Sequence, residues 1–240
     1  HKQQLHEYDS PYTICYENKD GPYSIYIHAA PIQYKTSDGY AVIDNTVIAS
    51  DKDGFTFENK ANEIKTYFPD SFNQLFRVER NNEYMEFAID GDVSDFSKAK
   101  QKNHVNMYGD AVSAVVYESS GMDMVFYPTR AGIKMEVVLK EKPDSNQINF
   151  RIFSHGTLYE NKQNGYILLK NGQDNAGLIY KPLVMYNEGK EKQLDVTSQL
   201  KIKRAESGYD LNISINQEIL DKAVYPIKYD PSFELYLNKI

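Results

Sequence analysis

Apolar and polar residues alternate along much of this chain. Residues 133–139 read IKMEVVL, residues 148–153 read INFRIF, and residues 209–216 read YDLNISIN. A period of two predicts β-strands that turn one face to a core and the other to water. In the first of these strands Lys134 and Glu136 fall on the water face.

Short turn sequences separate the alternating stretches. They are rich in Asn, Asp and Gly, which tolerate the positive φ that tight hairpins need. The turns lie at residues 37–39, 53–54, 80–82, 164–165, 188–189 and 207–208. This spacing predicts about a dozen strands or more, as sandwiches and barrels have.

Helical periodicity is nearly absent; only residues 71–75 and 216–222 could form a turn or two. The pattern therefore predicts an all-β fold, a mostly antiparallel β-sandwich, built as one large sandwich or as two tightly joined lobes. Residues 91–106 show little periodicity and mark the possible lobe boundary. We expect an N-terminal extension with the first strands at residues 1–22, the sandwich at 23–231, and a C-terminal tail at 232–240 that leads to a following domain.

The charge balance excludes two classes of partner. Lys and Arg total 27 against 34 Asp and Glu, which gives a net charge of −7. The basic residues are scattered, whereas a nucleic-acid surface needs them clustered. No apolar run approaches the roughly 18 residues of a membrane span. We therefore expect neither nucleic-acid binding nor membrane insertion.

Cysteine usage fits a protein that folds without disulfides, because Cys15 is the only cysteine. Within TICYE it is interpreted as a small apolar filler. The chain starts at His1 with no initiator Met and no signal-like region, so we expect an excised fragment or a mature product.

Signatures of catalysis and metal binding are weak in this sequence. The sequence lacks the His and Cys spacing of a zinc site, a phosphate-binding glycine loop and a Gly-x-Ser-x-Gly motif. Asp90, Asp92 and Asp95 lie on one irregular loop and could converge on a calcium ion, although a solvated acidic loop is the simpler interpretation. The two carboxylates of a glycoside hydrolase have no fixed separation in sequence, so the sequence singles out no such pair. We expect no enzyme activity and no cofactor other than this possible calcium.

Tyrosine is the most suggestive residue type. The chain has 20 Tyr and no Trp, and five Tyr crowd the first thirty residues. A tyrosine ring can stack on a sugar or contact a protein, but it also suits half-buried strand positions. Tyr12, Tyr23 and Tyr26 are the predicted ligand-binding residues.

Five sequence blocks occur in order between residues 23 and 231. They are residues 40–46 (YAVIDNT), 57–64 with 68–69 (FENKANEI and FP), 121–127 (GMDMVFY), 132–139 (GIKMEVVL) and 225–231 (YPIKYDP). The set resembles the N-terminal region of large Gram-positive surface proteins that carry RHS/YD repeats or a DNRLRE domain, such as wall-associated proteins. Met135 and Tyr229 depart from the family pattern, which has Glu and Ile there, without breaking strand alternation.

The resemblance implies an exported module at the cell surface or wall, beside repeats or further β-domains of the same polypeptide, with no catalytic residues to carry over. The first hypothesis is a non-catalytic structural or adhesive module. The alternatives are a carbohydrate-binding module that recognises cell-wall or plant glycans through exposed Tyr, and a glycan-active enzyme fragment or part of a toxin-delivery protein. A Lys–Asn or Lys–Asp isopeptide crosslink beside a buried acid stays open as well.

Overall fold

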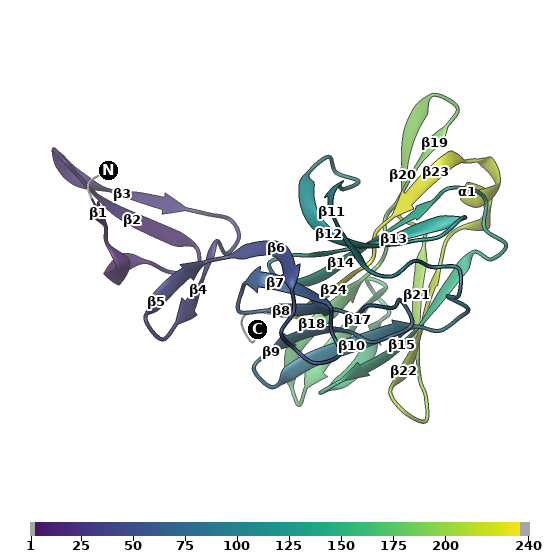
Figure 1. The fold of residues 1–240 in the computed structure, drawn as a ribbon, viewed down its shortest axis with the longest axis horizontal. Helices are drawn as coiled ribbons and strands as arrows, with labels where there is room; N and C mark the ends of the chain where they lie inside the picture. The colour runs from purple at the N-terminus through teal and green to yellow at the C-terminus, as the bar shows by residue number, and fades with distance from the viewer. Residues whose placement is uncertain (1–2, 236–240) are drawn as a thin grey trace.

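The computed structural model describes residues 3–235, and nearly all of its regular structure is β (Figure 1). Two large antiparallel sheets form a sandwich, and an arm built from the first five strands projects from one end of it. The predicted all-β, mostly antiparallel sandwich is confirmed. Within the described residues, no helix is long and apolar enough to cross a membrane.

The first sheet of the sandwich has eight strands. Their order is β21 (Gln199–Arg204), β22 (Tyr209–Ser214), β15 (Gln147–Ser154), β10 (Glu83–Ile89), β9 (Phe76–Arg80), β8 (Lys65–Phe68), β7 (Phe57–Ala61) and β6 (Asp44–Ala49). Three neighbouring pairs, β6–β7, β9–β10 and β21–β22, are hairpins at turns that the sequence predicts. Asn81, between β9 and β10, has a positive φ of 54°, as the tight turn requires.

The second sheet has eleven strands. Its main path is β11 (Lys100–Val105), β12 (Ala111–Glu118), β13 (Met122–Pro128), β14 (Gly132–Leu139), β24 (Ser232–Leu235), β18 (Asp174–Tyr180), β17 (Tyr166–Asn171) and β16 (Thr157–Asn161). A branch adds β23 (Val224–Tyr229), β19 (Val184–Glu188) and β20 (Glu191–Asp195) beside β14.

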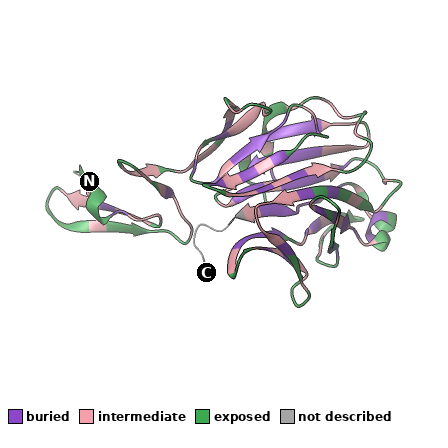
Figure 2. Ribbon diagram, turned by 90° about the horizontal axis from the view of Figure 1, so that it is seen from below, coloured by how far each residue is buried: buried purple, intermediate pink, exposed green. Residues whose placement is uncertain are grey.

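The apolar faces of the two sheets meet in one core (Figure 2). Phe76 of β9 stacks on Phe126 of β13 with ring centroids 4.3 Å apart, and Phe87 of β10 stacks on Phe233 of β24 at 4.0 Å. Each of these rings is fully buried. Burying a phenylalanine contributes roughly 1.5–3 kcal/mol, so this aromatic column is a main source of stability.

The sandwich runs from β6 to β24, that is from residue 44 to residue 235. The predicted bounds were 23–231, but residue 23 lies in an arm strand, and Ser232–Leu235 form a central strand between β14 and β18. Residues 236–240 of the predicted tail lie outside the described part of the chain. Residues 91–106, considered as a lobe boundary, carry the chain from β10 in one sheet to β11 in the other, across one shared core.

The two stretches with helical character behave as expected. Gln217–Lys222 form α1, and the Asn216 side chain caps its first turn by accepting a hydrogen bond from the Glu218 N–H. Residues 71–75 form a hydrogen-bonded turn, in which the Gln74 N–H donates to the Ser71 carbonyl at 3.0 Å.

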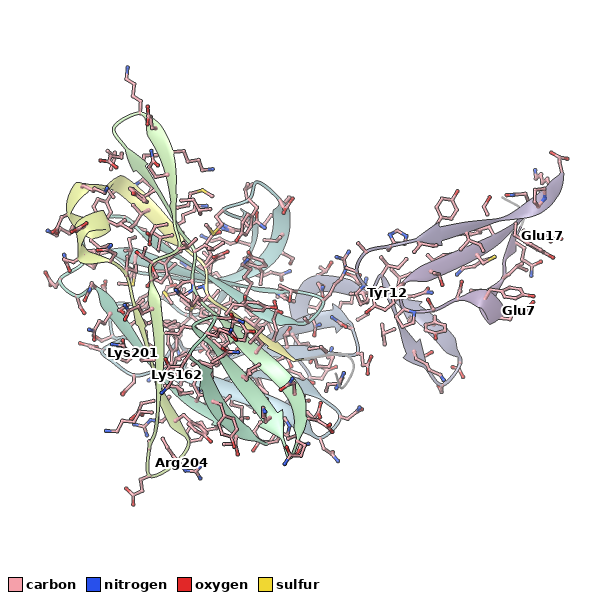
Figure 3. All side chains as sticks on the ribbon, turned by 180° about the vertical axis from the view of Figure 1, so that it is seen from behind. Glu7, Tyr12, Glu17, Lys162, Lys201 and Arg204 are labelled. Carbon is pink, nitrogen blue, oxygen red and sulfur yellow. The ribbon has the colours of Figure 1, made fainter. Side chains whose placement is uncertain are left out.

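The arm consists of two small antiparallel sheets. One has the order β1 (Gln3–Gln4), β2 (Thr13–Asn18) and β3 (Gly21–Ile27), with the short 3₁₀ helix η1 (His6–Tyr8) between β1 and β2. The other pairs β4 (Gln33–Thr36) with β5 (Gly39–Val42). Figure 3 shows side chains projecting along the arm, with Tyr12 nearer the sandwich and Glu17 farther out.

Candidate functional site

A small polar core gives the arm a defined structure. The Asp9 carboxylate is buried and accepts hydrogen bonds from the Gln4 side chain at 2.7 Å and from the Cys15 N–H at 3.2 Å. The Gln33 amide is also buried and donates to the carbonyls of Ser10 and Thr13 at 2.7 and 2.9 Å. These bonds tie the two small sheets together, because satisfied buried polar groups fix a single arrangement.

Strand β3 carries three large apolar side chains that are mostly exposed. Tyr23 is 63% exposed, Ile25 62% and Ile27 78%. These three residues alternate with Ser24 and Tyr26, so their side chains share one face of the strand. The Tyr8 ring lies beside the Tyr23 ring at a centroid distance of 6.5 Å and extends this apolar face.

The predicted ligand-binding tyrosines do not form one platform. Tyr23 and Tyr26 are three positions apart on β3, so they lie on opposite faces of the sheet. The Tyr26 ring contacts the Tyr16 ring edge-on at 5.8 Å. Tyr12 precedes β2 and is less exposed than either. The structure keeps all three at the surface and brings Tyr23 together with Tyr8 instead.

The two isoleucines of β3 were missed by sequence reasoning, which considered only the aromatic rings. The signal was present in residues 21–27, GPYSIYI, which contain no charged residue and place apolar side chains on both faces. A strand with a solvated face normally alternates with polar residues. The absence of that alternation at a surface strand indicates a contact surface.

Within residues 3–235 no strand pairs with the outer edge of β3. Among the described strands β3 pairs only with β2. The Leu5 N–H donates to the Cys15 carbonyl at 2.8 Å, so the backbone of Cys15 faces β1 and not β3. Cys15 is opposite Ile25, which makes this a non-hydrogen-bonded pair. The N–H and C=O of Ile25 therefore point away from β2, and those of Ile27 do the same by alternation. The register shifts just before Ser24, but the Pro22 carbonyl points toward Asn18 of β2, so the N–H of Tyr23 in the same peptide points outward.

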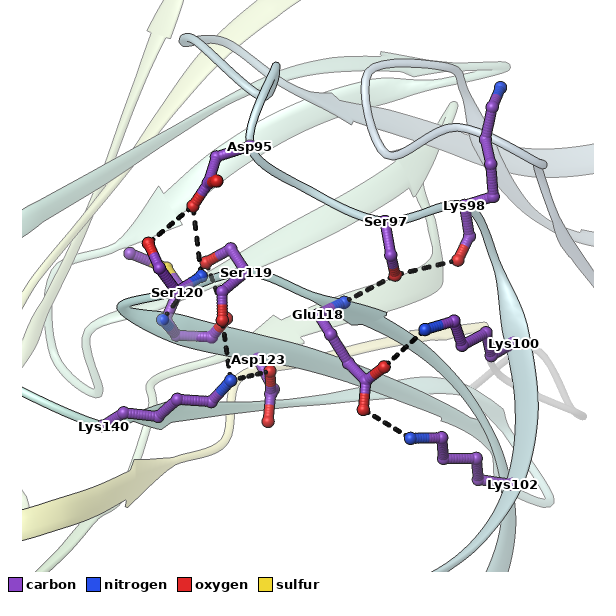
Figure 4. A network of polar contacts seen from close by, with 11 residues as sticks. Asp95, Ser97, Lys98, Lys100, Lys102, Glu118, Ser119, Ser120, Asp123 and Lys140 are labelled. Carbon is purple, nitrogen blue, oxygen red and sulfur yellow. Dashed lines mark hydrogen bonds and ion pairs between the residues drawn. The ribbon is translucent and has the colours of Figure 1, made fainter.

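The three predicted calcium ligands do not all line the same hollow. Asp92 and Asp95 line a hollow of about 430 Å³, whereas Asp90 lies outside it. The Asp92 carboxylate accepts from the Ser94 N–H at 2.9 Å. Asp95 accepts from the Ser120 hydroxyl at 2.8 Å (Figure 4). These hydrogen bonds lower the pKa of both carboxyls. Within residues 3–235 no three His, Cys, Asp or Glu side chains gather to hold a metal ion. The calcium site stays a prediction.

Beside this loop lies an ion-pair network that fixes one end of the large sheet. Glu118 accepts from Lys100 at 2.7 Å and from Lys102 (Figure 4). These two ammonium groups lower the pKa of Glu118 to about 2. The Glu118 N–H donates to the Ser97 hydroxyl at 3.0 Å. The network links β11, β12 and the loop before β11.

The most buried charge in the sandwich is Glu136 of β14. Its side chain is fully buried and accepts hydrogen bonds from His104 Nε2 at 2.7 Å, the Met107 N–H at 2.6 Å and Lys228 Nζ at 3.0 Å. Burial raises the pKa of Glu136, but the bonds from His104 and Lys228 outweigh it and hold the pKa below its ordinary value. Sequence alternation placed Glu136 on the water face, and that prediction is wrong, because the β11–β12 turn folds over it.

A second buried carboxylate, Asp230, lies nearby. It accepts from Lys134 Nζ at 2.7 Å and from the Tyr108 hydroxyl at 2.6 Å. Burial and this bond raise the pKa of Tyr108. Together the Glu136 and Asp230 bonds anchor the β11–β12 turn to β14 and to the end of β23. Their carboxylates are sealed from solvent, so the arrangement serves structure.

Comparison of the chain with protein-family models, with curated proteins and with solved structures finds no match. Function is therefore inferred from the residues and their geometry, and the arm offers the surface with the clearest capacity for contact.

Proposed function

We propose that this chain is a non-catalytic structural and adhesive β-sandwich module of a large exported bacterial surface protein, placed at the cell surface or wall. The sandwich forms the structural body of the module, and the arm forms its contact surface toward neighbouring domains or wall components. The ordered sequence blocks that resemble Gram-positive surface proteins support the setting.

The observation that carries the proposal is the exposed apolar face of β3. Leaving a large apolar side chain in water forgoes roughly 1.5–3 kcal/mol of burial free energy. Ile25 and Ile27 are both mostly exposed on an arm that has its own buried polar core. A strand that keeps a defined shape while exposing such residues gains this free energy when it meets a partner.

Cosedimentation with isolated Gram-positive cell walls tests the proposal. The variant Ile25→Lys places a charge in the centre of the apolar face. Leu194→Lys is the matched control, since Leu194 is 58% exposed on β20 of the sandwich. We expect the wild-type chain and Leu194→Lys to pellet with the walls and Ile25→Lys to stay in solution. Equal pelleting of the two variants, or no pelleting of the wild type, contradicts the proposal.

Glycan binding by the arm is the second candidate function, and the Tyr8–Tyr23 pair favours it. Two neighbouring exposed rings on one face suit stacking on sugar rings, which bury apolar C–H faces against aromatic rings. Affinity electrophoresis on cell-wall and plant polysaccharides tests this. We expect Tyr23→Ala to abolish retardation and Tyr26→Ala, on the opposite face, to retain it. Retardation that survives Tyr23→Ala excludes this surface.

A further inference from the structure

The open edge of β3 is complementary to itself. If two copies place their β3 strands antiparallel with Ile25 at the twofold axis, Ile25 faces Ile25 and Tyr23 faces Ile27. Ser24 then faces Tyr26 on the other side of the sheet. Aromatic and β-branched residues are favourable cross-strand neighbours, and no like charges meet, because residues 21–27 carry none.

The direction of the backbone groups suits the same register. Tyr23, Ile25 and Ile27 direct their N–H and C=O groups outward, as the bond from the Leu5 N–H to the Cys15 carbonyl establishes. In the twofold arrangement these groups form about six hydrogen bonds between the copies, each residue exchanging both of its bonds with the residue opposite. The sheet β1-β2-β3 then continues into the β3-β2-β1 sheet of the second copy.

The edge is protected at its start only: β2 and β3 change register between Tyr16 and Asn18, opposite residues 21–24, whereas residues 24–27 pair regularly with β2. Surface edge strands are usually blunted by lysine, by a bulge or by an outward proline. Pro22 is the single proline of β3, and its carbonyl accepts from the Asn18 side chain of β2, so it is directed inward. Lys19 and Asp20 lie in the turn before the strand. The outward positions are Tyr23, Ile25 and Ile27 alone.

We propose that two copies of this chain associate through their arms by antiparallel pairing of β3 with β3, centred on Ile25. This rests on the proposed function and names the partner of the same surface. Strand pairing plus the exposed side chains covers on the order of 1,000 Å² in total, at the lower end of specific interfaces. The dimer is therefore weak, with a dissociation constant on the order of 10 μM.

Salt strengthens the association. Each copy carries a net charge of −7, so two copies repel one another. Added salt screens that repulsion and leaves strand pairing and apolar contact intact. An assembly held by ion pairs weakens with salt instead.

Sedimentation velocity of the whole chain over a range of concentrations tests the proposal. We expect a concentration-dependent dimer for the wild type and for Leu194→Lys, and a monomer for Ile25→Lys, which brings two lysines together at the twofold axis. Circular dichroism and thermal unfolding confirm that each variant is folded. A wild type that stays monomeric at concentrations well above 10 μM, or Ile25→Lys that dimerises as the wild type does, overturns it.

Oxidative crosslinking tests the register independently of the lysine variant. A cysteine at position 25 faces its copy across a hydrogen-bonded pair with Cα atoms about 5.5 Å apart, within reach of a disulfide. A cysteine at position 27 lies about 13 Å from its copy. We expect Ile25→Cys to form a covalent dimer and Ile27→Cys to form none. Equal crosslinking of both variants overturns the register and with it the proposal.

The two proposals fail separately. If the wild type is monomeric but still pellets with cell walls through Ile25, the adhesive function stands and the pairing of copies is wrong. If the chain dimerises through β3 but neither form binds walls, the pairing stands and the adhesive function is wrong.

Discussion

Replacing Glu136 by alanine is expected to destabilise the sandwich far more than removing an exposed carboxylate. The substitution leaves the buried Met107 N–H without an acceptor, and it takes from His104 and Lys228 the carboxylate that each of them contacts. A buried donor without an acceptor costs about 1–3 kcal/mol. Breaking a buried ion pair costs about 3–5 kcal/mol.

Part of that cost is recovered, because the Lys228 side chain is partly exposed and its ammonium group can turn to water. We therefore expect a loss of about 3 kcal/mol in the free energy of unfolding, near the lower bound for a broken buried pair. For a chain of this size, that loss lowers the melting temperature by roughly 6–12 °C. Glu118→Ala is the matched control: it also removes a carboxylate that binds two cations, but a partly exposed one worth less than about 1 kcal/mol.

Urea unfolding followed by circular dichroism measures both variants, and hydrogen exchange locates the effect. Exchange is expected to accelerate first in the turn between β11 and β12, because the Glu136 bonds hold that turn against β14. Equal destabilisation by Glu136→Ala and Glu118→Ala refutes the reasoning, as does unchanged exchange in the turn.

Three further results are expected. The folded-state pKa of Glu136 lies below the ordinary glutamate value of 4.5, so its contribution to stability is present above that pH and is lost as the pH falls through the folded pKa. Urea titrations across this range should show a shallower acid loss of stability for Glu136→Gln than for the wild type. Gly208→Ala should cost more than Gly189→Ala by at least about 1 kcal/mol, because both have positive φ but only the Gly208 Cβ would meet a backbone oxygen, at 2.4 Å, and equal melting temperatures contradict this. Intact mass should equal the sequence mass, because Lys134 and Asp230 form an ion pair to which the Tyr108 hydroxyl also donates; a mass lower by one water reveals an amide crosslink instead.

The all-β fold could be predicted because its signals are local. Residues 209–214 alternate strictly and form β22, and the Asn-containing turn at Asn81 joins β9 to β10. Strand order is set by long-range pairing and leaves little local trace. Ser232–Leu235 looked like the start of a tail, yet they insert between β14 and β18, where Phe233 completes the aromatic column. A four-residue strand after a proline has too short a pattern to show this.

The arm could be predicted only in part. Tyrosine crowding drew attention to the residues that form the arm, because residue composition can be read without knowing the fold. The three-residue spacing of Tyr23 and Tyr26 already implied opposite faces once the strand was known. The open edge could not be predicted, since it depends on which side of β2 carries β1. Glu136 was misplaced for a related reason: a turn more than twenty residues earlier in the chain covers it.

Residue-resolved amide exchange at Ile25 tests most directly whether the edge of β3 is the contact surface. Exchange is measured for the dilute chain, for the concentrated chain and for the chain bound to cell walls. We expect rapid exchange at Tyr23, Ile25 and Ile27 in the dilute chain and marked protection of the same three amides in the concentrated or bound chain. Equally rapid exchange of Ile25 under all three conditions contradicts a contact surface on this edge.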